Sequence, residues 1–289
     1  MNHIITAVGL IVVVAVIVAA RRSIFPASLH AFPTVYRVAR MTVAEARRRK
    51  VMQVGFILAI GMLLSWRFLS YLSPGEKYKV VIDTGLATIS FAGMLLTIFV
   101  GAFLIPTEVE RRTAYAVLAK PVKRFEFVLG KYLGLLALVA ALVVALSVVF
   151  ALVLVLDPEI RTGGLNVKDL GWAIVLSYFA LAIFGSLVLL VSTMTSTTMT
   201  VIVGFGLWIV GSLQSTMQNL ANHAEGGQRV LINVIYTIMP KLESFDARWL
   251  VSNHVPIPPV PALLTIGGGL IYLAVVLILA VLIFNERQV

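Results

Sequence analysis

Residues 83–134 read DTGLATISFAGMLLTIFVGAFLIPTEVERRTAYAVLAKPVKRFEFVLGKYLG. The first part, residues 84–106, is an apolar run long enough to cross a bilayer, which takes roughly 20 helical residues. A short charged segment follows, and a second long apolar run begins at Phe125. This order predicts two membrane-spanning helices joined by a polar segment, which is where a soluble partner could move a membrane protein.

The charged segment carries the signals of a short helix of its own. Thr107 can cap its start, and Glu110 lies three residues further on, as in a capping box. Glu108 and Arg112 are spaced i, i+4 in the favourable order. Pro121 ends the helix, because the residue before a proline avoids the α region. Periodicity alone leaves two interpretations equally open: a helix that docks on a partner protein, and a solvated loop.

Residues 108–134 also match a longer string. The matching residues are Glu108, Glu110, Arg111, Arg112, Thr113, Leu118, Lys120, Pro121, Arg124, Glu126, Phe127, Leu129, Gly130, Lys131, Tyr132, Leu133 and Gly134. They resemble the permease subunits of type-2 ATP-binding-cassette (ABC) exporters, most closely the class associated with multi-copper enzyme maturation. The resemblance implies a cytoplasmic coupling helix at 107–120 that meets the ATPase subunit. The contact residues that it implies are Thr107, Glu108, Glu110, Arg111, Arg112, Thr113, Lys120, Pro121 and Arg124.

Composition places the rest of the chain in a membrane as well. Of the 289 residues, 60% are hydrophobic, whereas average soluble chains have about 45–50% apolar residues. The length allows six or seven spans with short loops, and it leaves no room for a large soluble domain. The chain has no Cys, so a disulfide framework, a thiolate metal site and a cysteine nucleophile are all excluded.

The net charge of +10 has two interpretations, a nucleic-acid partner and basic cytoplasmic loops. Most of the Lys and Arg lie in two loops an even number of spans apart. They are Arg21, Arg22, Arg37, Arg40, Arg47, Arg48, Arg49 and Lys50 in the first loop, and Arg111, Arg112, Lys120, Lys123, Arg124 and Lys131 in the second. The positive-inside rule places both loops in the cytoplasm, the N-terminus outside and the C-terminus inside. No nucleic-acid partner is therefore expected.

The fold class predicted is an all-α polytopic membrane protein, with about six core transmembrane helices and one extra N-terminal span. Residues 1–33 form that extra helix and a linker, and 34–289 form the type-2 ABC transmembrane domain. A cleaved signal peptide is the rival for 4–20, but the positive charge there follows the apolar run instead of preceding it. The core spans are predicted at about 51–72, 82–105, 127–156, 170–192, 198–219 and 262–284.

Residues 220–261 are predicted to form short amphipathic helices on the outer face. This segment is rich in proline but too apolar for a disordered loop. Pro240, Phe245 and Asp246 resemble a pattern in the external segment of the same family.

Residues 34–50 are predicted to form an amphipathic elbow helix at the membrane interface. One face carries Val35, Val38, Ala39, Thr42 and Ala46. The opposite face carries Arg37, Arg40, Ala44, Arg47 and Arg48. The alternative is a solvated basic linker. The clean separation of the two faces disfavours this alternative.

No catalytic, metal or cofactor site is predicted in this chain. No phosphate-binding Gly-x-x-x-x-Gly-Lys-Ser/Thr string occurs, so ATP and Mg²⁺ would be bound by the partner subunit. The four His are scattered, and Met194 and Met199 are interpreted as packing residues and not as copper ligands. The spans contain no acid at mid-membrane, which disfavours an ion-coupled carrier. Arg67 and Asp83 lie near the outer ends of their spans and are predicted to pair or to reach water independently.

A hydroxyl-rich turn between two spans leaves two interpretations open. It contains Ser192, Thr193, Thr195, Ser196, Thr197, Thr198 and Thr200. The first interpretation is a turn with hydrogen bonds between helices. The second is a polar lining at the inner mouth of a transport pathway, formed by Ser192, Thr193, Thr197 and Thr200.

The leading hypothesis is the permease subunit of an ABC exporter in the cell (inner or cytoplasmic) membrane, which is not itself an enzyme. Its partners would be an ABC ATPase subunit dimer, a second permease copy or a related permease, and the lipid bilayer. One alternative is a carrier or channel without an ATPase. Another is a membrane subunit that transmits ATP-driven motion to an extracytoplasmic partner. The sequence does not identify the substrate.

Overall fold

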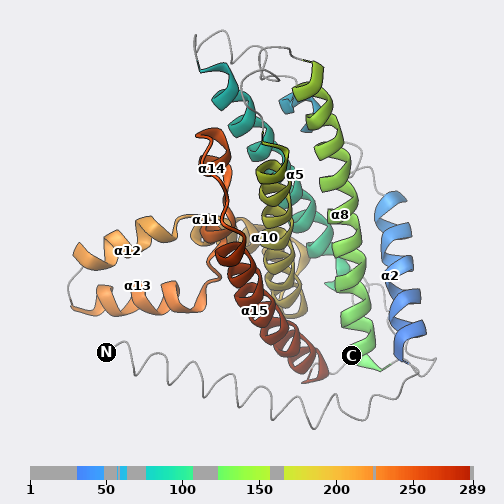
Figure 1. Ribbon diagram of the computed structural model, residues 1–289. Coiled ribbons are helices and arrows are strands. Elements are labelled where there is room, and N and C mark those ends of the chain that lie inside the picture. The colour runs from blue at the N-terminus through green and yellow to red at the C-terminus, as the bar shows by residue number, and fades with distance from the viewer. Residues whose placement is uncertain are drawn as a thin grey trace.

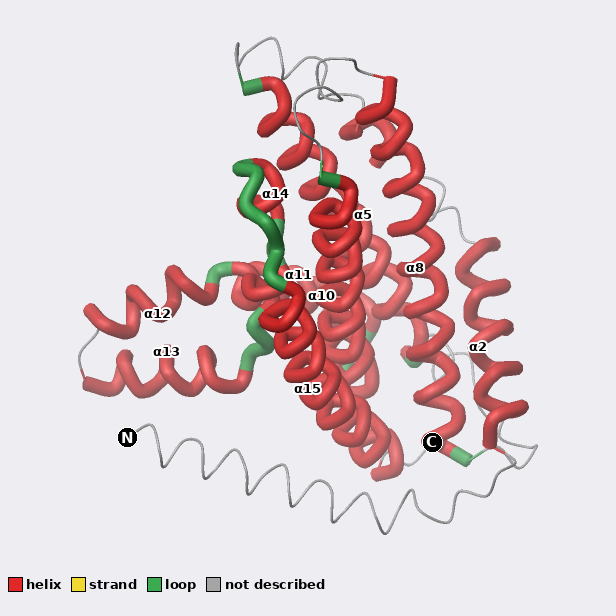
Figure 2. Tube along the Cα trace, in the orientation of Figure 1, coloured by secondary structure: helices red, strands yellow, loops and turns green. Residues whose placement is uncertain are grey.

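The computed structural model describes most of the chain after residue 30. The described residues are 31–48, 57, 59–63, 76–106, 123–156, 166–223 and 226–286. Within these ranges every regular element is a helix and none is a strand, as Figure 2 shows. The predicted all-α class is therefore confirmed for this part of the chain.

Four long helices form the bundle (Figure 1). They are α5 (Lys77–Leu104), α8 (Arg124–Leu156), α10 (Val167–Met194) and α15 (Pro259–Glu286). Each is long and apolar enough to cross a membrane, and each covers one of the predicted spans. The chain is therefore a multi-pass membrane protein. The total of six core spans and one extra span depends on residues outside the described ranges and stays a prediction.

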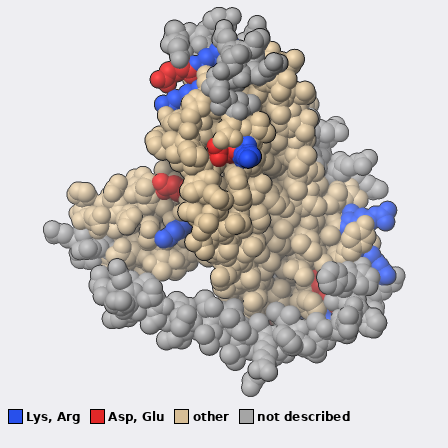
Figure 3. Space-filling model, in the orientation of Figure 1, with Lys and Arg blue, Asp and Glu red and all other residues tan. Residues whose placement is uncertain are grey.

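Helix α10 lies at the centre of the bundle. It packs against α5, α8 and α15, and every side chain from Ala180 to Leu189 is buried. In the apolar segment of α15, by contrast, few residues are fully buried. Figure 3 shows a surface that is mostly uncharged on one face, with Lys and Arg along the edge formed by α2. A surface of this kind suits contact with lipid.

The predicted span 198–219 is not one straight helix. The chain forms α11 (Thr197–Ser212) and α12 (Gln214–His223), which are bent by 73° at Leu213. The side-chain amide of Gln214 donates to the carbonyls of Met239 and Pro240, both at 3.3 Å. These bonds hold the start of α12 against the segment that follows α13, so α12 does not continue the direction of α11. With α12 and α11 taken as one broken span, the described residues hold up to five spans.

The remainder of the predicted external segment is made of short helices. Helix α13 (Gly226–Ile238) pairs with α12 in a hairpin that projects from the bundle in Figure 1. The chain then returns through the 3₁₀ helix η1 (Leu242–Phe245) and α14 (Arg248–Ser252), which packs against α5. The position of these helices outside the membrane stays a prediction.

The predicted elbow corresponds to α2 (Ala31–Arg48), which lies along α8 in Figure 1. Its buried side chains include Val35, Val38, Thr42 and Ala46, as the sequence pattern indicates. The close approach of α2 to α8 depends on Gly130 and Gly134 of α8. A Cβ atom at Gly130 would lie 2.7 Å from Val38 Cβ, and one at Gly134 would lie 2.6 Å from Thr42 Cβ. Small residues four apart let two helices in a membrane protein come this close.

Candidate functional site

The start of α8 is the part of the described structure that directly follows the predicted coupling segment. Arg124 is the first residue of α8, and its Nη1 donates to the carbonyls of Asn285 at 2.9 Å and Phe284 at 3.3 Å. These are carbonyls of the last turn of α15, where a cation is favoured because the carbonyls lack helical partners. The rings of Phe127 and Phe284 stack with centroids 5.7 Å apart. The first turn of α8 is therefore bound to the last turn of α15.

One turn further along, α8 is bound to two more helices. The buried Lys131 places its Nζ 3.9 Å from the Glu45 carboxylate of α2 and 5.6 Å from the centre of the Phe127 ring. A buried ammonium group needs such partners to offset the loss of hydration. The buried Tyr132 hydroxyl donates to the carbonyl of Ala182 in α10 at 2.9 Å. We call this region, residues 124–134 of α8 with their contacts in α2, α10 and α15, the inner junction.

The structure describes part of the predicted site. The coupling residues outside its described ranges are Thr107, Glu108, Glu110, Arg111, Arg112, Thr113, Lys120 and Pro121. Arg124 is described and belongs to the inner junction. Of the predicted elbow residues, Arg37 and Arg40 are exposed on α2, while Arg47 and Arg48 belong to its last turn. Their roles in coupling and at the membrane interface stay predictions.

The hydroxyl-rich turn is held by local hydrogen bonds. Ser192 and Thr193 donate to the carbonyls of Leu189 and Leu190, at 2.7 and 2.6 Å. Thr200 donates to the Ser196 carbonyl at 2.9 Å, and its hydroxyl lies 2.9 Å from that of Thr195. Ser192, Thr193 and Thr200 are buried and Thr197 is half-buried. These bonds are those of a turn with helix back-bonding, and the pathway role of Ser192, Thr193, Thr197 and Thr200 stays a prediction.

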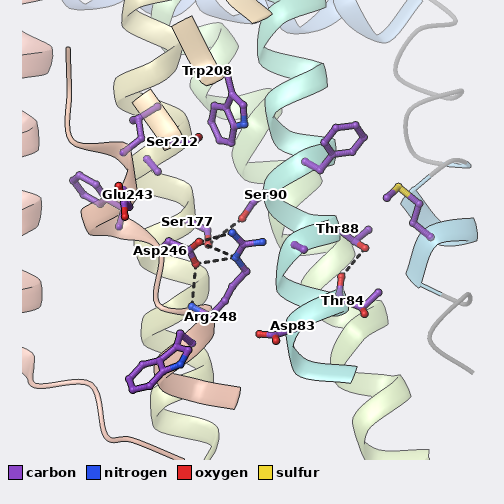
Figure 4. Close-up of a pocket in the computed structure, with 17 residues that line it drawn as sticks. Asp83, Thr84, Thr88, Ser90, Ser177, Trp208, Ser212, Glu243, Asp246 and Arg248 are labelled. Atoms are coloured by element: carbon purple, nitrogen blue, oxygen red, sulfur yellow. Dashed lines mark hydrogen bonds and ion pairs between the residues drawn. The ribbon is translucent and has the colours of Figure 1, made fainter. Parts of the chain in front are cut away.

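Near the other end of α5 lies a cavity of about 780 Å³, which we call the Asp83 cavity. Its walls come from α5, α10, α11, η1 and α14, and from Met62 earlier in the chain (Figure 4). Its charged lining residues among the described ones are Asp83, Glu243, Asp246 and Arg248. Its aromatic lining residues are Phe91, Trp208, Phe245 and Trp249. The sequence does not indicate this cavity, because the residues that form its walls are far apart in the chain.

Two of the charged residues neutralise each other. Arg248 Nε donates to both Asp246 oxygens, at 2.8 and 2.9 Å, and its Nη2 donates to Asp246 Oδ2 (Figure 4). Burial raises the pKa of Asp246, but the hydrogen bonds and charge of Arg248 outweigh it and hold that pKa below its usual value. The same hydrogen bonds raise the pKa of Arg248. At neutral pH the two residues therefore form an ion pair.

The other two carboxylates have different surroundings. Glu243 Oε2 accepts a hydrogen bond from the backbone N–H of Ser215 at 2.7 Å, at the start of α12, where a negative charge is favoured. Asp83 interacts with the side chain of Ser252 and with the charge of Arg248. Arg67, its predicted partner, lies outside the described residues. No local pattern indicated Arg248 as a site residue, because only the return of η1 and α14 to the bundle brings it near Asp83.

One comparison with known proteins identifies a family for this chain. A family model described as "ABC-2 family transporter protein" matches residues 2–289. No curated protein matches the sequence. The family match spans nearly the whole chain and fits the apolar helices of the bundle. The chain therefore belongs to the ABC-2 family of transporter proteins.

Proposed function

We propose that the chain is the permease subunit of an ABC exporter, which moves substrate outward across the cell membrane. ATP hydrolysis is supplied by a separate ATPase subunit, which binds ATP and Mg²⁺. The observation that carries the proposal is the ABC-2 family match over residues 2–289. Two permease copies, or this chain and a related one, form the complete membrane unit.

In this proposal the coupling helix at 107–120 moves with the ATPase subunits when they close on ATP. The inner junction supports this role, because it begins at Arg124, only a few residues after the coupling segment. Arg124 connects α8 to α15, Lys131 connects it to α2, and Tyr132 connects it to α10. A displacement of the start of α8 is therefore passed to three other helices at once.

The test is a charge reversal in the coupling segment. Glu108→Lys combined with Arg112→Glu keeps opposite charges at i, i+4 but inverts the charges that a partner meets. We expect normal insertion, weaker co-purification of the ATPase subunit and loss of substrate-stimulated ATP hydrolysis, because partner charges at the interface are left unpaired.

The matched control reverses an exposed ion pair elsewhere on the membrane domain. Glu76 and Lys79 form an ion pair of 3.7 Å at the opposite end of α5, so Glu76→Lys with Lys79→Glu makes the same kind of exchange away from the coupling segment. We expect this control to bind the ATPase subunit normally. Full ATPase binding and full transport by the Glu108/Arg112 variant would show that the segment is only a solvated loop. ATPase binding without any transported substrate would favour force transmission to an external partner.

A further inference from the structure

We propose that the Asp83 cavity binds amphipathic organic cations, in which a positive centre is carried on an apolar or aromatic body. The inference deepens the proposed function and rests on it, because the bound cation would be the class of substrate exported. The cavity volume of about 780 Å³ lies within the range of roughly 300–1,000 Å³ typical of small-molecule sites. The walls come from segments far apart in the chain that meet only in the folded bundle.

The charge of the described lining favours a cation. Arg248 is the only described basic residue that lines the cavity, and its Nε and Nη2 are used by Asp246. That pair is neutral as a whole, so among the described lining residues Asp83 and Glu243 leave a negative balance. Among the described residues, the other cation that acts on Asp83 is Lys79, which pairs with Glu76 at 3.7 Å. In surroundings less polar than water, a carboxylate attracts a cation more strongly than it does in solution.

The aromatic residues of the cavity would bind both the positive centre and the apolar body of the ligand. Phe91 and Trp249 remain 42% and 66% exposed although both are large and apolar. Trp208 is placed by an edge-to-face contact with Phe184, with centroids 4.9 Å apart. Figure 4 shows Trp208 and Asp83 on opposite sides of the Asp246–Arg248 pair. Aromatic faces attract cations through the negative charge of the ring surface and also bind an apolar body.

An anionic ligand fits the cavity less well. An anion would be expected to bind the guanidinium of Arg248, but the Nε and Nη2 of this group already bind both oxygens of Asp246. It would also meet the negative charges of Asp83 and Glu243. A neutral ligand would gain nothing from these carboxylates. The combination of carboxylates, aromatic faces and an occupied arginine therefore selects for positive charge.

The experiment uses the purified full chain in nanodiscs of phosphatidylcholine, without an ATPase subunit. The probes are tetraphenylphosphonium and tetraphenylborate, which share size and shape and differ in the sign of their charge. Binding is measured by equilibrium dialysis against empty nanodiscs, which account for partition into lipid. We expect saturable binding of tetraphenylphosphonium and none of tetraphenylborate above the lipid background.

Asp83→Asn should weaken tetraphenylphosphonium binding by at least about tenfold, as expected when one partner of a desolvated charge pair is removed. Glu286→Gln is the matched control, since it removes an exposed carboxylate at the end of α15, outside the cavity, and we expect unchanged binding. Phe91→Leu keeps an apolar side chain and removes the ring, so a loss of affinity in this variant tests the site independently if Asp83→Asn does not fold.

Equal binding of the two probes, or full affinity in both Asp83→Asn and Phe91→Leu, would overturn the inference. Other outcomes test the proposed function separately from the cation site. Tetraphenylphosphonium binding without ATPase association supports the cation site and rejects ATP-driven export. ATPase association without tetraphenylphosphonium binding rejects the cation site alone.

Discussion

The inner junction and the Asp83 cavity differ in how their charged groups are used. At the inner junction, Arg124 and Lys131 bind groups on other helices, and two glycines bring α2 against α8. In the Asp83 cavity, Arg248 binds a residue only two positions away in the chain, and two further carboxylates line a hollow. One region is therefore closely packed between helices, while the other is hollow. Four substitutions can break or sharpen this contrast.

The largest effect is expected where the helices approach most closely. Gly130→Ala places a Cβ atom 2.7 Å from Val38 Cβ and 3.0 Å from the Val35 carbonyl, so α2 must shift. Overpacking of this kind costs about 2 kcal/mol, measured as a loss of thermal stability in detergent. Gly171→Ala is the matched control, because no atom lies within 4 Å of its added Cβ. Alanine there should stabilise the helix by about 0.5–1 kcal/mol. Equal effects of the two substitutions would contradict the tight contact of α2 and α8.

A smaller loss is expected at the end of α15. Arg124→Ala removes two charge-assisted hydrogen bonds to the last carbonyls of that helix. Because Arg124 is half-buried, we expect a loss of about 1 kcal/mol. Arg124→Lys should recover part of it, since a point charge still favours a helix C-terminus. Arg40→Ala, at an exposed position of α2, should change the stability little. If Arg124→Ala is as harmless as Arg40→Ala, the start of α8 is not anchored as described.

The ion pair beside the cavity should contribute less, and its contribution should depend on pH. Arg248 holds the pKa of Asp246 below its usual value despite burial, so the pair adds stability above the unfolded carboxyl pKa. That stability is lost as the pH falls through the lower, folded pKa. Both side chains are over a third exposed, so Asp246→Asn should cost at most about 1 kcal/mol at pH 7. Melting curves of both proteins should converge at acidic pH. A difference that does not depend on pH would mean that Asp246 acts through packing.

The smallest effect is expected inside the cavity wall. Ser90 and Ser177 form a long hydrogen bond of 3.4 Å between α5 and α10. Ser177→Ala should cost no more than about 0.6 kcal/mol, the mean for such bonds between helices in a membrane protein. Thermal unfolding in detergent is again the measurement. A cost as large as that of Gly130→Ala would mean that the cavity wall is as tightly constrained as the inner junction.

The parts of the fold that follow from local pattern could be predicted from sequence. The lengths of apolar runs gave α5, α8, α10 and α15 to within a few residues, and the helical period of 34–50 gave the buried face of α2. These features depend on near neighbours in the chain. The family resemblance also agreed with the comparison over nearly the whole chain.

The features that depend on distant residues could not be predicted. The bend at Leu213 is held by bonds from Gln214 to Met239 and Pro240, and nothing near Gln214 indicates those partners. The polar residues after Leu213 were the only local sign that the apolar helix ends there. In the same way, Arg248 reaches the surroundings of Asp83 only through the return of α14 to α5.

The bend at Leu213 has a consequence for the surrounding bilayer. Helix α11 has 16 residues, so it rises roughly 24 Å, against a hydrocarbon core of about 30 Å. A helix shorter than the core requires local thinning of the lipid or protein that covers its polar end. Because residues 198–219 are predicted to span the membrane, we expect membrane thickness to act on the hairpin of α12 and α13. Bilayers with shorter acyl chains should relieve this mismatch, and the lipid would then help to determine the shape of this protein.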